Sequence, residues 1–279
     1  MKKNIIGFIL IVVCGLNLFG DDFELGKEAL KKGDFEQANQ LFLQDCNNDN
    51  ITNCKDIGNI YLNGNIIKKD YPKAIEFFTK VCNDQFVDGC SKLGTMYQYG
   101  NGVKKDYTKA IELYNKACDN GKSNGCFHLG TVYEKGYEVK QDYNKANELF
   151  EKACNGGNAK GCLQLGRIYE NGHGVKQDYH KAKELFEKAC NGESANGCYN
   201  LGIIYALGQG TKQDYTKANE LFEKICNNGN ANGCNSLATS YYKGNGVKQN
   251  IQKSKELLKK ACDLGKEKSC NNYAFLNKQ

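Results

Sequence analysis

The chain has 279 residues, a formal net charge of +6, one proline and no tryptophan. Acidic and basic residues are interleaved along most of the sequence, which excludes the concentrated basic patch of a typical nucleic-acid-binding protein. The scarcity of proline fits an array of helices joined by short glycine-containing turns.

The N-terminal segment has the pattern of an export signal. Residues 1–3 are basic at two positions, and residues 5–18 form an apolar run. This order is typical of a cleaved secretory signal peptide, so we expect residues 1–20 to be removed. The run is short for a membrane anchor, which needs about 20 apolar residues. A lipidated Cys14 would follow the bulky Val13 instead of a small residue. We therefore expect a secreted or periplasmic protein with no membrane span after cleavage.

Cysteines recur in pairs eight positions apart, and each pair begins 36 residues after the previous one. This constant period predicts a stacked array of repeats. Removal of the signal peptide would take Cys14 with it and leave 14 of the 15 cysteines, and an even number of cysteines in an exported chain favours disulfides. Zinc is disfavoured because the short spacings of structural zinc sites do not occur, and we expect no metal or cofactor. The pairs are Cys46/Cys54, Cys82/Cys90, Cys118/Cys126, Cys154/Cys162, Cys190/Cys198, Cys226/Cys234 and Cys262/Cys270.

The repeat unit 87–122 predicts two helices. Apolar residues at helical spacing indicate a first helix, helix A, over 90–97. Gly100 lies where that helix should end in a left-handed conformation. Asp106 is a good N-cap for a second helix, helix B, over 107–117, so that each unit is a helical hairpin. The inward face of helix B is expected to hold Ala110, Ile111, Leu113 and Tyr114.

The hairpin pattern recurs along the chain and changes at both ends. Most helices A contain a leucine–glycine dipeptide, with Ala238 replacing the glycine in one unit. Because glycine inside a helix costs about 1 kcal/mol relative to alanine, its recurrence predicts close helix approach. A shorter first hairpin over 23–46 and an unpaired last helix over 267–277 are typical of caps. We therefore predict an all-α fold with one elongated solenoid domain over 21–279, made of seven hairpins and a C-terminal capping helix.

The cysteine spacing leaves two disulfide connectivities open. The first cysteine of each pair is expected to end a helix B, and the second to lie in the opening of the next helix A. Pairing Cys118 with Cys126 closes a loop of about eight residues. Pairing Cys126 with Cys154 is the alternative, since both lie at the same end of antiparallel helices. The short loop is favoured, and peptide mapping without reduction distinguishes the two.

The repeat resembles a known family. The pattern Leu-Gly-x-x-Tyr-x-x-Gly-x-Gly-Val at 93–103 and 165–175 is similar to Sel1-like repeats, which are themselves like tetratricopeptide hairpins. The added Cys-x7-Cys on a 36-residue period resembles the Helicobacter cysteine-rich proteins, a secreted subfamily. This resemblance implies a right-handed α/α superhelix of disulfide-linked hairpins. It also implies slow β-lactamase or penicillin-binding activity for some members and contacts with host proteins for others.

Catalytic motifs are weak in this sequence. The tetrad from Ser240 to Lys243 matches the Ser-x-x-Lys element of serine β-lactamases, but the supporting Ser-Asp-Asn and Lys-Thr-Gly elements are missing. One such tetrad is expected by chance from the serine and lysine content. The three histidines, His128, His173 and His180, show no metal-binding motif and are expected on the surface or in turns.

A second face of helix A is the candidate binding surface. It is formed by the positions two before and one, five and eight after the second cysteine, and we expect it to line the concave side of the solenoid. Asparagine amides can hydrogen-bond a peptide backbone, and Phe127, Leu163 and Tyr199 form an apolar run. The alternative is that these are ordinary exposed positions. The candidate residues are Asn124, Phe127, Thr131, Leu163, Arg167, Asn196, Tyr199 and Asn232.

These observations predict a monomeric binding module for a peptide, a protein or a peptidoglycan-derived ligand. The alternative function is slow hydrolysis of β-lactams, with β-lactams as ligands, which only the family resemblance implies.

Overall fold

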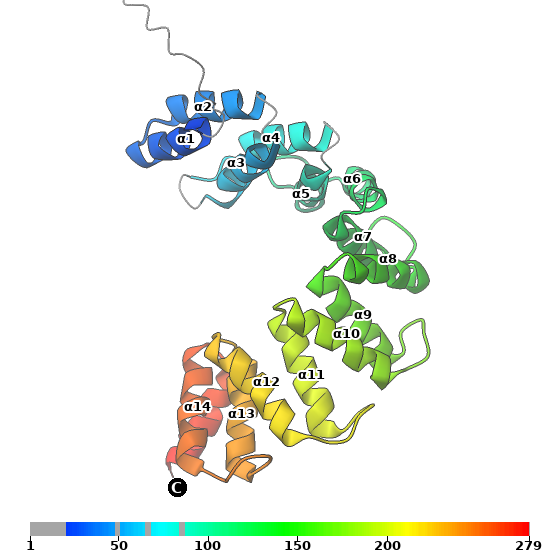
Figure 1. Ribbon diagram of the computed structural model, residues 1–279, viewed down its shortest axis with the longest axis vertical. Helices are drawn as coiled ribbons and strands as arrows, with labels where there is room; N and C mark the ends of the chain where they lie inside the picture. The colour runs from blue at the N-terminus through cyan, green and yellow to red at the C-terminus, as the bar shows by residue number, and fades with distance from the viewer. Residues whose placement is uncertain (1–20, 48–50, 65–67, 84–86, 279) are drawn as a thin grey trace, which may run out of the picture. The chain divides into compact units, whose positions relative to one another are not determined.

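The computed structural model describes residues 21–47, 51–64, 68–83 and 87–278, and all regular structure in these ranges is α-helical (Figure 1). The chain divides after Gly89 into two compact units, which are described separately. Within the described ranges, no helix is long and apolar enough to cross a membrane. The predicted signal peptide lies outside the described residues, and the single continuous domain stays a prediction.

The first unit contains two helical hairpins. Helix α1 packs against α2, and α3 packs against α4. The rings of Phe42 and Phe78, both fully buried, fill the space between the paired helices. Pro72 lies in the first turn of α4, where a missing amide proton breaks no helical hydrogen bond. The helices are α1 (Asp21–Lys32), α2 (Phe35–Asn47), α3 (Ile51–Asn63) and α4 (Tyr71–Asn83).

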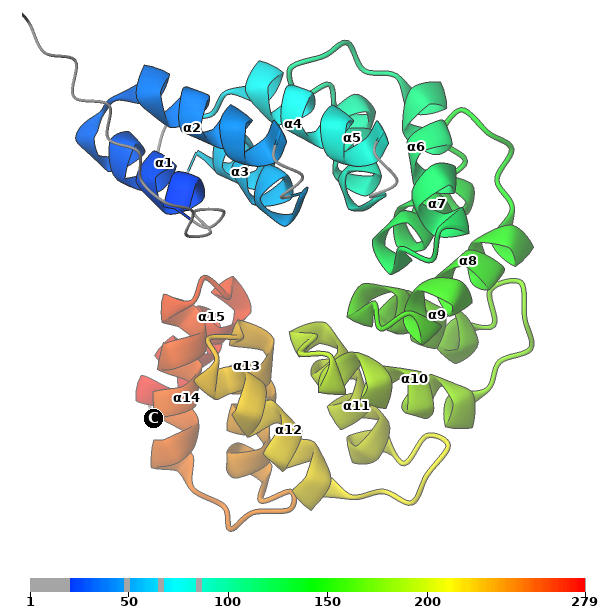
Figure 2. The ribbon, with the colours of Figure 1, turned by 45° about the horizontal axis from the view of Figure 1, so that its top comes forward.

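The second unit continues the alternation of helix A, odd-numbered, and helix B, even-numbered. From α6 to α15 each helix packs against the next, and Figure 2 shows the successive hairpins in chain order. The helices are α5 (Asp88–Tyr99), α6 (Tyr107–Asp119), α7 (Ser123–Lys135), α8 (Tyr143–Asn155), α9 (Ala159–Asn171), α10 (Tyr179–Asn191), α11 (Ala195–Leu207), α12 (Tyr215–Asn227), α13 (Ala231–Lys243), α14 (Ile251–Asp263) and α15 (Glu267–Asn277). The predicted all-α solenoid of helical hairpins is confirmed.

Helix ends follow the predicted signals. The carboxylate of Asp106 accepts a hydrogen bond from the Lys109 amide at 2.9 Å and caps α6. Ala110 and Tyr114 of that helix are fully buried, whereas the other two predicted inward residues are partly buried. Gly172 ends α9 in the left-handed conformation with φ 73°. The turn between α7 and α8 lacks the second glycine of the repeat pattern. Glu138 takes that position with φ 53°, a left-handed conformation that residues other than glycine rarely adopt.

The repeated glycine of helix A marks a close contact with an aromatic ring of helix B. A Cβ atom added at Gly166 would lie 2.6 Å from the Phe186 ring, and one at Gly202 would lie 2.5 Å from the Phe222 ring. The predicted close helix approach is therefore confirmed. In the last hairpin, Ala238 takes the position of the glycine and Leu258 takes the position of the aromatic ring.

A double-mutant cycle tests this pairing. Gly202→Ala is expected to cost about 1–3 kcal/mol through overpacking, offset by about 1 kcal/mol from the better helix propensity of alanine. Adding Phe222→Leu should relieve the overpacking, since it recreates the combination found in the last hairpin. Urea unfolding of the two single variants and the double variant measures the coupling. Additive effects of the two substitutions would contradict the contact.

At six junctions, a disulfide joins a helix B to the next helix A. The Cα atoms of the bridged cysteines lie between 4.4 and 5.1 Å apart, and every bridge spans eight positions. The structure thus has the short loop, and the alternative pairing of Cys126 with Cys154 does not occur. Cys82 and Cys90 are also disulfide-bonded. So many disulfides suggest an oxidising, extracytoplasmic environment. The bridges are Cys46–Cys54, Cys118–Cys126, Cys154–Cys162, Cys190–Cys198, Cys226–Cys234 and Cys262–Cys270.

Candidate functional site

An open pocket of about 390 Å³ lies where the first turns of α7 and α9 meet. The turn at Gly157 brings the start of α9 beside α7, and two of the predicted binding residues, Asn124 and Phe127, enter the pocket from α7. The remaining predicted residues lie elsewhere on helices A and do not line it. The lining residues are Ser123, Asn124, Phe127, His128, Gly157, Asn158, Ala159, Lys160 and Gly192.

The predicted asparagines are exposed, and two of them contact the neighbouring repeat. The Asn158 side-chain amide donates to Asn124 Oδ1 at 2.8 Å. The Lys266 ammonium donates to Asn232 Oδ1 at 2.6 Å. Both donors belong to the residue that precedes the first turn of the next helix A. Asn196 is exposed on α11. The amides of Asn124 and Asn232 therefore link successive repeats, and all three asparagines present polar groups to solvent.

The predicted apolar run is largely used in packing. Phe127, Leu163 and Tyr199 belong to the same core cluster of α7 to α12. Leu163 is only 7% exposed, and the Phe127 and Tyr199 rings lie 6.0 and 5.9 Å from the rings of Phe150 and Phe222. The two aromatic rings are partly exposed. A ligand at this face would meet two partly exposed rings instead of a deep apolar slot.

The remaining predicted residues lie further along the helices A. Thr131 is half-buried and its hydroxyl donates to the Phe127 carbonyl oxygen at 3.0 Å. Arg167 is exposed and donates to the Gln164 side chain at 3.3 Å. Burial raises the pKa of the nearby Glu170, and the positive charge of Arg167 opposes that shift. Arg167 therefore supplies an accessible positive charge on the face.

His128 is less exposed than the other two histidines. His173 and His180 are exposed, as expected of surface or turn positions, whereas His128 is partly buried on α7, at the edge of the pocket. Its ring stacks on Tyr114 with centroids 5.0 Å apart and contacts Phe127 edge-on at 5.3 Å. Burial lowers the pKa of His128 to about 4, and the charges of Lys160 and Lys92 add to this. The imidazole beside the pocket is therefore neutral at physiological pH.

The β-lactamase-like tetrad is part of the α13 helix. Ser240 is buried, and its hydroxyl donates to the Ser236 carbonyl oxygen one turn earlier at 3.4 Å. Lys243 is exposed at the end of the same helix. This arrangement is that of an ordinary helical serine and a lysine that favours the negative end of the helix dipole.

The helical hairpins and their bridges define a disulfide-linked helical repeat protein. Six Sel1 repeats match the sequence, at residues 54–84, 87–122, 123–158, 159–194, 195–230 and 231–266. The chain belongs to the Sel1 repeat family. No curated protein matches it.

Solved structures of Sel1 repeat proteins resemble this chain. The protective antigen c5321 of uropathogenic Escherichia coli aligns with a TM-score of 0.75 and 27% identity, over 91% of this chain and 56% of that chain. This chain therefore spans about half the length of that protein. The Sel1 repeat protein of Oxalobacter formigenes aligns with a TM-score of 0.75 and 29% identity, over 86% of this chain and 99% of its own. The Helicobacter pylori cysteine rich protein B is 30% identical over 62% of this chain and 98% of its own, with a TM-score of 0.28.

Proposed function

We propose that the chain is an exported binding module whose helix-A face takes an extended peptide segment of a partner. The pocket between α7 and α9 carries this proposal, because three kinds of recognition group converge there. Asn124 offers an amide, Lys160 an ammonium group and Phe127 a partly exposed ring. Amide and ammonium groups suit the carbonyls and carboxylates of a peptide, and the ring suits an apolar side chain. The peptide stem of a cell-wall fragment offers the same groups.

The repetition of this chemistry supports an extended ligand. Exposed asparagines recur at the same helix-A position on α7, α11 and α13, and Lys160 occupies that position on α9. Repeat arrays typically bind extended partners along such a surface. The disulfides support export, since they form and persist in oxidising compartments.

Replacing the asparagine row tests the proposal. Peptides selected from a random displayed library against the oxidised protein are expected to bind the Asn124→Ala/Asn196→Ala/Asn232→Ala variant at least about tenfold more weakly, as expected when recognition groups worth more than 1 kcal/mol are removed. Binding is measured by calorimetry. Thermal unfolding should change little, because the two hydrogen bonds that are lost are exposed.

The helices B provide a matched control. Glu151, Glu187 and Glu223 are exposed at equivalent positions of three successive helices B, α8, α10 and α12. Replacing all three by alanine should leave the affinity within about twofold, because surface side chains outside a contact contribute little to binding. Equal affinities of the wild type and the asparagine variant would exclude the proposed binding face.

A further inference from the structure

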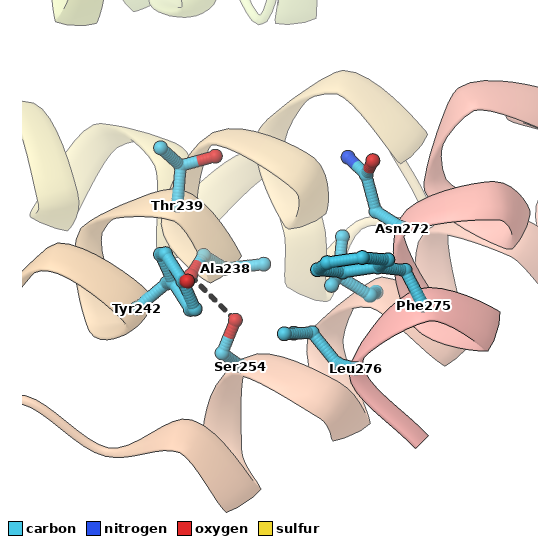
Figure 3. Close-up of a pocket in the computed structure, with 8 residues that line it drawn as sticks. Ala238, Thr239, Tyr242, Ser254, Asn272, Phe275 and Leu276 are labelled. Atoms are coloured by element: carbon cyan, nitrogen blue, oxygen red, sulfur yellow. Dashed lines mark hydrogen bonds between the residues drawn. The ribbon is translucent and has the colours of Figure 1, made fainter. Parts of the chain in front are cut away.

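A second pocket, of about 270 Å³, lies in the last hairpin between α13, α14 and α15 (Figure 3). Its inner wall contains Ala238 and Leu258, which are buried. Tyr242 from α13 and Phe275 from α15 face each other across it, and these two rings are 43% and 60% exposed. The pocket is therefore apolar inside and open to solvent between two aromatic side chains.

The position of this pocket corresponds to that of an aromatic ring in earlier hairpins. Four repeats before, the Tyr114 ring packs on Gly94, where an added Cβ would lie 2.7 Å from it. The Tyr114 hydroxyl donates to Gln98 Oε1 at 2.6 Å, and its oxygen lies 3.3 Å from Thr95 Oγ1. The 36-residue period carries these positions onto residues 238, 239 and 242, all of which line the pocket. The shorter Leu258 replaces the ring and leaves this space open.

Hydroxyl groups in the pocket wall are oriented to accept hydrogen bonds. The Thr239 hydroxyl donates to the Asn235 carbonyl oxygen at 3.0 Å, and the Ser254 hydroxyl donates to the Ala238 carbonyl oxygen at 2.8 Å. With their protons used in this way, both oxygens present lone pairs to a ligand. Thr95 is the equivalent of Thr239; its hydroxyl also donates to a carbonyl oxygen one turn earlier, and its oxygen lies 3.3 Å from the Tyr114 hydroxyl oxygen. The pocket wall therefore favours a ligand that donates a hydrogen bond, as a phenol does.

The stretch of chain that supplies all three helices around the pocket, α13 to α15, is basic. Residues 231–279 contain nine lysines and three acidic residues, a formal net charge of +6. This equals the net charge of the whole chain, so the preceding residues are neutral in sum. A concentration of one sign attracts partners of the opposite sign.

We propose that this pocket binds the phenol ring of a tyrosine that lies in an acidic segment of a partner protein. The volume is sufficient, because an apolar cavity of about 150 Å³ already holds a benzene ring. The ring would occupy the place that Tyr114 occupies in its own hairpin, but it would enter from solvent. This site is separate from the pocket of α7 and α9, so its failure would leave the proposed function unaffected.

An acetylated and amidated heptapeptide with one central tyrosine between glutamates serves as the probe. In a methyl NMR titration of the oxidised protein, the methyl signals of Ala238, Leu258 and Leu276 are expected to shift. The matching phenylalanine peptide should bind about fivefold more weakly because it lacks the phenol proton, and the alanine peptide should leave these signals unchanged. Equal binding of the tyrosine and alanine peptides, or shifts confined to other methyl groups, would overturn the proposal.

Filling the pocket from within provides the decisive variant. Ala238→Gly/Leu258→Phe restores the glycine and ring of the earlier hairpins, and it should weaken binding of the tyrosine peptide at least about tenfold. Phe275→Ala alters only an exposed ring at the mouth and should weaken binding about fivefold even if the filled variant does not fold. Asn124→Ala in the other pocket is the control and should bind like the wild type. Unchanged affinity in a folded filled variant, or in Phe275→Ala, would refute the site.

Discussion

Replacing Cys190 and Cys198 by alanine is expected to lower the free energy of unfolding by about 2.5 kcal/mol. The bridge closes an eight-residue separation between α10 and α11, and both cysteines are buried. In the unfolded chain, the bridge restricts the loop that it closes, and its removal returns this conformational entropy. Urea unfolding of the oxidised protein, followed by circular dichroism, measures the loss.

The terminal bridge is the matched control for this prediction. Cys262 and Cys270 have the same sequence separation, so the entropy term for the Cys262→Ala/Cys270→Ala variant should be equal. The folded states differ, however, because α15 packs mainly on α14 in the described part of the chain, whereas α10 and α11 pack on further helices before and after them. Loss of the central bridge should therefore broaden the unfolding transition, and loss of the terminal bridge should mainly loosen α15. A central variant as stable as the wild type would contradict a stabilising role for the bridges.

The fold could be predicted from the sequence because the signals that specify it are local and repeat along the chain. Asp106 caps its helix within three residues, and Gly172 ends its helix within the same turn. The cysteines mark the joints between hairpins at a constant spacing. Each of these signals acts over a few residues, and repetition along the chain makes each one visible several times.

The candidate binding site was harder to predict from the sequence, because it depends on contacts between repeats. Asn124 has a polar side chain that suits a binding face, but its hydrogen bond to Asn158 comes from the next repeat. Leu163 occupies a predicted surface position and is nevertheless buried in the shared core. The pocket of the last hairpin depends on two substitutions relative to the earlier repeats, Ala238 on one helix and Leu258 on another. Only the packing of helix B against helix A shows that these two positions meet.

Acidification from pH 7 to pH 5 is expected to cost the folded state about 2 kcal/mol through His128 alone. Burial lowers the pKa of this imidazole from 6.5 to about 4 in the folded protein. The unfolded chain therefore takes up a proton near pH 6.5, before the folded chain does. The resulting stability is complete above pH 6.5 and is lost as the pH falls towards 4. Urea unfolding at several pH values between 7 and 5 measures this loss.

His128→Gln is the variant that isolates this contribution. Glutamine occurs at the equivalent position one repeat later, at Gln164, so the helix is expected to tolerate it. The variant should lose about 2 kcal/mol less than the wild type over the same pH interval, because an amide does not titrate there. His180→Gln replaces an exposed histidine on α10 and is the matched control, which should keep the wild-type pH dependence. If the His128→Gln variant and the wild type lost stability in parallel, the stacked imidazole between Tyr114 and Phe127 would not be held neutral by its burial.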